Sequence, residues 1–77
     1  MNEQVLGLLT QKNKLLSEID ISRSELEALR ANGIQSIKDA ARIGILMDII
    51  GSKESLIRDI ENVLETYNQR LIKLEKE

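Results

Sequence analysis

The chain has 77 residues, of which 42% are hydrophobic and 31% are charged, and its 11 basic and 13 acidic side chains give a net charge of −2. A domain of this size buries only about 60% of the surface that its unfolded chain exposes, so its core is thin. The absence of cysteine and histidine excludes a disulfide framework and a thiolate or imidazole metal centre. The balanced charge is unlike the basic surface of a dedicated nucleic-acid binder.

The composition predicts an all-α fold in one domain, residues 1–77, because the chain has no proline and strong helix formers fill most of it. Two short segments are typical of helix boundaries. Asn32-Gly33 tolerates the left-handed conformation that closes a helix, and Gly51-Ser52 combines a second stop with a capping serine. We therefore expect a coiled-coil-like three-helix bundle, or a hairpin plus a third helix, with helices at about 3–31, 35–50 and 53–75.

The first expected helix carries an apolar stripe whose members are spaced alternately three and four residues apart. The stripe consists of Val5, Leu8, Leu15, Ile19, Leu26 and Leu29. Lys12 and Ser22 interrupt it, while Leu9 and Leu16 widen it near the N-terminus. Such spacing is typical of a coiled-coil seam, and the extra width favours a bundle of several helices.

The last expected helix has apolar residues on two neighbouring lines. One line contains Leu56, Ile60, Val63, Tyr67 and Leu74, and the other contains Ile57, Leu64 and Leu71. A helix with two apolar lines needs covering from two directions. This pattern again predicts more than one packing partner.

The segment IGILMDII, residues 43–50, is apolar nearly all round the middle expected helix. Leu46 and Ile49 fall on the arc that is polar in the first half of that helix. A helix that is apolar on every side is buried on every side, and two helices of the same chain cover only part of it. A second copy of the chain is the simplest further cover, since most soluble oligomers are symmetric. We therefore expect a homodimer whose interface contains Ile43, Ile45, Leu46, Met47, Ile49 and Ile50.

Asp48 is the one charged residue in this segment, and its helical phase places it on an apolar side. A buried carboxylate without a partner is costly, and the dipole at a helix C-terminus disfavours it further. We expect Asp48 to pair with Lys12 or Lys53 and to fix register or partner choice. The alternative is a rim carboxylate that reaches solvent.

The sequence contains no phosphate-binding glycine loop, nucleophile elbow or calcium-binding loop, so we expect neither an enzyme nor a bound cofactor or metal. Met47, Gly51, Ile57 and Ile60 have offsets that resemble a helix-turn-helix, but Ser52 follows the glycine where an apolar residue is usual. A DNA-binding regulator is therefore one alternative function.

The expected layout of a hairpin followed by an amphipathic helix resembles the small co-chaperones of type III secretion. With neither a secretory signal nor a membrane-spanning stretch in the sequence, we expect a cytoplasmic protein. The function that the pattern favours is protein binding through an apolar helix face, as an adaptor, a chaperone or an inhibitor.

Overall fold

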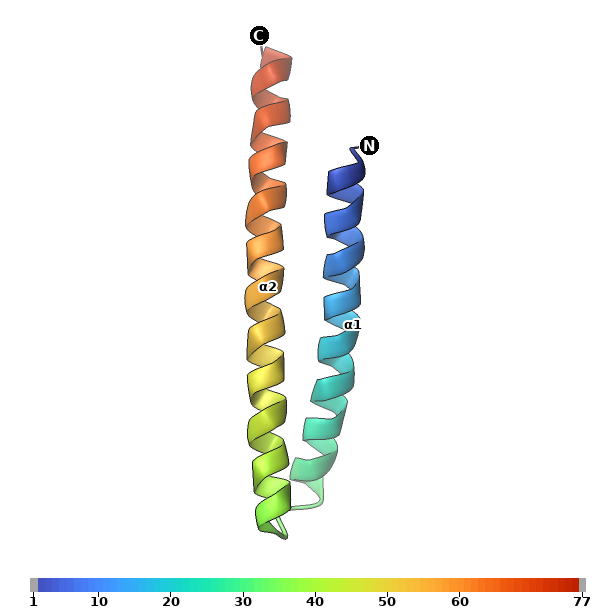
Figure 1. Cartoon of the computed structure of the whole chain (residues 1–77), viewed down its shortest axis with the longest axis vertical. Helices are drawn as coiled ribbons and strands as arrows, with labels where there is room; N and C mark the ends of the chain where they lie inside the picture. Colours follow the sequence, from blue (N-terminus) through green and yellow to red (C-terminus); the bar gives the residue numbers. More distant parts are fainter. Residues whose placement is uncertain (1, 77) are drawn as a thin grey trace.

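The computed structural model describes residues 2–76, apart from the side chains of residues 72, 75 and 76, and shows an antiparallel helical hairpin (Figure 1). Helix α1 spans Glu3–Ala31 and helix α2 spans Ile37–Lys76. The described residues contain no strand. The molecule measures 63 × 16 × 15 Å, and α2 extends beyond the N-terminal end of α1 (Figure 1).

The turn between the helices forms where Asn32-Gly33 predicts it. The amide of Asn32 donates to the carbonyl of Ala28, and Gly33 has a φ of 78°, a left-handed conformation that glycine adopts without steric cost. Ser36 then caps α2, because its hydroxyl accepts a hydrogen bond from the amide of Asp39. The predicted end of the first helix is confirmed.

Most of the hydrophobic contact in the hairpin lies along one line between the two helices, which we call the main seam. The stripe predicted for the first helix is confirmed, since each of its members is buried or half-buried. Lys12 and Ser22 lie half-buried on the same line. The buried residues of the main seam are Leu15, Ile19 and Leu26 from α1, and Leu46, Ile50, Ile57 and Ile60 from α2.

The prediction of a third helix is wrong, because α2 continues through Gly51 and Ser52 without a break. A glycine inside a helix costs only about 1 kcal/mol relative to alanine, and no proline forces an end. Ile50 and Ile57 lie on either side of Gly51, and both pack against α1. Continuous packing on both sides of the glycine outweighs this local preference for a stop.

Candidate protein-binding surface

The segment predicted to form the interface is divided between the core and two exposed flanks. Leu46 is 2% exposed and packs with Ile50 in the main seam, so α1 of the same chain covers both residues. The reasoning that Leu46 needs a second chain to cover it is therefore wrong. Ile43 packs against the same core. The apolar side chains of the segment that α1 leaves exposed lie on two different flanks of α2.

Ile45 and Met47 are the two members of this segment that are about half exposed. Two positions along a helix correspond to about 200° around it, so these side chains lie on opposite flanks of α2. Ile49 is half-buried and lies on the flank of Ile45. A single partner helix therefore cannot cover both Ile45 and Met47.

The predicted pairing of Asp48 is not formed in the hairpin. Asp48 is exposed, and within residues 2–76 it belongs to none of the ion pairs. Lys53 instead donates to the carboxylate of Glu18, and Lys12 lies half-buried in the main seam. The helical phase of Asp48 points it away from α1, because the main seam runs along another side of α2.

A second apolar row follows α2 outside the main seam, and we call it the outer seam. Its members are separated by four and then twice by seven residues, and they are Ile45, Ile49, Leu56 and Val63. At 3.6 residues per turn the row lies roughly 90° around α2 from the main seam. Ile45, Leu56 and Val63 are between 44% and 50% exposed. The outer seam is thus a coiled-coil stripe without a partner in the hairpin.

A shallow hollow adjoins the outer seam where α1 and α2 meet. It has a volume of about 410 Å³ and is lined by Leu15, Glu18, Asp48, Ile49, Ser52, Lys53 and Leu56. Ser52 has a small side chain between two large ones, which leaves room for an incoming side chain. The hollow therefore combines an apolar floor with charged groups at its rim.

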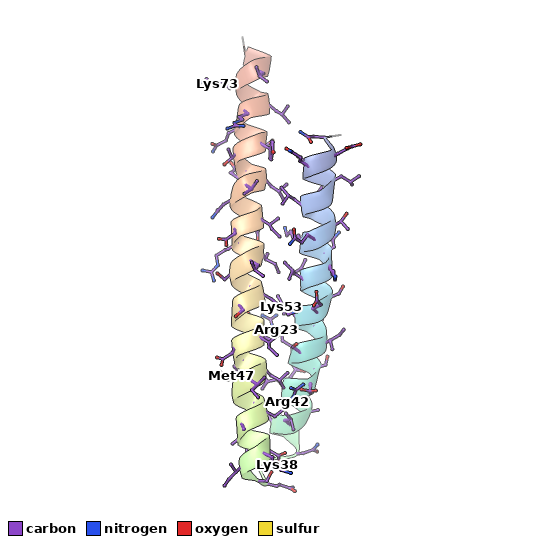
Figure 2. The ribbon with its side chains drawn as sticks, viewed as in Figure 1. Arg23, Lys38, Arg42, Met47, Lys53 and Lys73 are labelled. Atoms are coloured by element: carbon purple, nitrogen blue, oxygen red, sulfur yellow. The ribbon has the colours of Figure 1, made fainter. Side chains whose placement is uncertain are left out.

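Ion pairs between the helices border the seams, and Figure 2 labels their basic members Arg23, Arg42 and Lys53. The guanidinium of Arg42 donates to Glu25 at 2.7 Å and Lys53 donates to Glu18. These hydrogen bonds lower the pKa of both glutamates below the ordinary value of 4.5, aided by the nearby positive charges. The ion pairs join α1 to α2. Those made by Arg23 and Arg42 are about half exposed and contribute little to stability, whereas the Lys53–Glu18 pair is partly buried.

The opposite flank has a hollow of about 430 Å³, where Met47 and Gly51 lie. A Cβ added at Gly51 would meet no atom within 4 Å, so this side of α2 has room for a methyl group. Two arginines, Arg23 and Arg30, and two glutamates, Glu27 and Glu54, also line it. Its mixed charge favours no particular ligand.

Leu56 and Val63 belong to the outer seam but not to the interface predicted from the sequence. The signal was present, since the segment from residue 53 onward has two apolar lines. The wrongly predicted break at Gly51 assigned Ile45 and Leu56 to different helices. Because α2 is continuous, the four residues form one row.

Comparisons with protein-family models, curated proteins and solved structures gave no match. In the part of the chain that the structure describes, no helix is long and apolar enough to cross a membrane. The same part contains no group of three or more acidic, histidine or cysteine side chains that could hold a metal ion. The helix-turn-helix alternative requires a turn at Gly51, where α2 is helical.

Proposed function

We propose that this chain is a small helical protein-protein interaction module that binds apolar helix faces along the outer seam and self-associates as a dimer. The outer seam is the observation that carries the proposal. Its residues match in type and spacing the α2 residues of the main seam, and α1 leaves three of them, Ile45, Leu56 and Val63, about half exposed. An adaptor, a chaperone or an inhibitor would use such a surface in the same way.

The mechanism that we propose is helix-in-groove recognition. An amphipathic helix binds such a surface by placing residues spaced three, four and seven apart into it. Removing an exposed aliphatic side chain from water contributes about 25 cal/mol per Å² of apolar surface, which is offset in part by the cost of bringing two chains together. Three half-exposed side chains in one row, with the hollow at Ser52 between them, offer a continuous contact for one helix.

The experiment that tests this function is sedimentation equilibrium of the wild type and of Leu56→Glu over a range of concentrations. We expect the wild type to be a dimer and Leu56→Glu to be a helical monomer, because the charge would be buried without a partner. Ile21→Glu is the matched control, since Ile21 is 71% exposed on α1 and lies outside the outer seam. A wild type that stays monomeric at every concentration contradicts the proposed self-association.

A further inference from the structure

We infer that the hairpin opens in two stages, and that residues 3–11 of α1 form an arm that detaches from α2 while the rest of the hairpin stays folded. Half-buried Lys12 marks the boundary of this arm. The inference concerns contacts within one hairpin, so it depends neither on the outer seam nor on self-association. Three features support it: the distribution of buried residues, the positions of the polar contacts between the helices, and the residues of the arm itself.

The buried part of the main seam ends at the level of Lys12. In the described part of the chain, the buried residues of α1 begin at Leu15 and those of α2 end at Ile60. The antiparallel register that joins Glu18 to Lys53 places Ile60 about level with Lys12. Beyond that level, the apolar side chains that the structure describes on both helices are half-buried or exposed. The arm therefore loses less apolar contact on leaving α2 than the rest of α1 would lose.

Lys12 also interrupts the apolar packing along α1. It occupies the seam position between Leu8 and Leu15, it is half-buried, and within residues 2–76 it belongs to none of the ion pairs. A polar residue at one seam position lowers the stability of the contact, because an ammonium group that approaches apolar surface without a charged partner loses hydration. The packing of Leu8 is therefore separated from the packing of Leu15.

The polar contacts between the helices are unequal on the two sides of Lys12. The three ion pairs of the described residues use α1 positions in the range 18–25, all on the side of the turn. Across the arm, the described residues form one hydrogen bond between the helices, from the hydroxyl of Tyr67 to Gln4. A single hydrogen bond makes only a modest net contribution to stability. The arm is thus held by fewer contacts than the part of α1 next to the turn.

The residues of the arm favour its unfolding once the contact with α2 is lost. Gly7 lies inside the arm, and glycine is the weakest helix former after proline. The hydroxyl of Thr10 donates to the carbonyl of Leu6, a bond that slightly destabilises a helix. Most helical stability in proteins comes from packing rather than from propensity. The arm should therefore lose its helical structure when it leaves α2.

Detachment of the arm would change the surface of α2. By the same register, the arm faces the half-buried residues Leu64 and Tyr67. Leu71 and Leu74 are already 59% and 67% exposed, where α2 extends beyond the end of α1 (Figure 1). Opening would join all four residues into one exposed apolar line. The arm thus acts as a removable cover over this part of α2.

The test is hydrogen exchange of single amides, followed by NMR in dilute solution so that any dimer is dissociated. It compares residues 7–11 with residues 19–29 and omits the first turn, whose amides lack partners in any helix. We expect protection factors at least about ten-fold lower in residues 7–11, similar to one another, with a step at Lys12. Equal protection on both sides of Lys12 would overturn the inference, and so would a smooth decline toward the N-terminus.

Two substitutions test whether the arm opens separately. Ile50→Val removes one buried methyl group, so it should lower the protection of residues 19–29 about five-fold and leave that of residues 7–11 unchanged. Gly7→Ala should raise the protection of the arm about five-fold, and its Cβ would meet no atom within 4 Å. If Ile50→Val lowers both sets by the same factor, the hairpin opens as one unit and the inference is wrong.

A third substitution tests the boundary. Lys12→Met should raise the protection of residues 7–11 about four-fold, because an apolar side chain restores the seam at that position. Lys14→Met is the matched control, since Lys14 is exposed and lies outside the seam. An unchanged arm in Lys12→Met, or an equal rise in Lys14→Met, would contradict the role of Lys12. Sedimentation tests self-association alone, so the two proposals can fail independently.

Discussion

The two apolar faces of α2 are built from the same residue types, and they differ in what covers them. Ile57 lies in the main seam and is buried, whereas its neighbour Leu56 lies in the outer seam and is 49% exposed. One residue along a helix is about 100° around it, which is enough to leave the contact with α1. Hydrophobicity therefore marks where α2 can pack, and the heptad phase decides which face its own hairpin fills.

We expect the largest difference in the free energy of unfolding when one leucine in each face is replaced by alanine. Leu46→Ala should lower the free energy of unfolding by about 2–5 kcal/mol, because it removes a buried side chain and leaves a cavity. Leu56→Ala should lower it by less than about 1 kcal/mol in dilute solution, where half of that side chain is already in water. Urea unfolding followed by circular dichroism measures both values.

Varying the protein concentration further distinguishes the two leucine substitutions. Dissociation makes the apparent stability of a dimer depend on protein concentration. The loss caused by Leu56→Ala should therefore grow as the concentration rises, while the loss caused by Leu46→Ala should be large at every concentration. Equal losses from both substitutions in dilute solution would contradict the division into a covered and an uncovered face.

A smaller effect comes from Gly51, which belongs to neither seam. Gly51→Ala should raise the free energy of unfolding by about 1 kcal/mol, because alanine favours the helix and its Cβ would meet no atom within 4 Å. Gly33→Ala is the control with the opposite expected sign, since Gly33 has a positive φ. A destabilised Gly51→Ala variant in thermal unfolding would show that this position has a conformational role in α2.

The smallest effect concerns acid. The pKa values of Glu18 and Glu25 are lowered in the folded hairpin from the ordinary 4.5. The stability that their ion pairs contribute is therefore fully present above pH 4.5 and is lost as the pH falls through the lowered values. We expect the midpoint temperature of unfolding to fall as the pH is lowered below about 4.5, and to fall less in the double variant Glu18→Gln/Glu25→Gln. An equal drop in this variant would assign the acid sensitivity to other carboxyl groups.

The seam of α1 and the turn at Asn32-Gly33 could be predicted from the sequence, because local pattern and packing favour the same structure there. At Gly51 they disagree. The glycine and serine favour a break, while Leu46, Ile50 and Ile57 continue the heptad pattern through it. Following the three-and-four spacing across the whole of α2 identifies a single helix.

The candidate site was less predictable, because it depends on which face α1 covers. The apolar excess in residues 43–50 predicts more than one packing direction, and α1 covers one of them in the hairpin. The sequence did not show that Leu46 faces α1 while Ile45 faces away. Asp48 illustrates the same difficulty. By helical phase it lies on the side of Ile34 and Ile37, which are apolar, but that side does not face α1. Both of those isoleucines are themselves exposed.

Tyr67 is the only aromatic residue of the chain, and its hydroxyl donates a hydrogen bond to Gln4 near the open end of the hairpin. Its ultraviolet absorbance and fluorescence therefore report on one location, while circular dichroism averages over both helices. If the open end frays before the rest unfolds, the tyrosine signal will change at a lower temperature than the helical signal. The chain thus contains its own optical probe for separation of the helix ends.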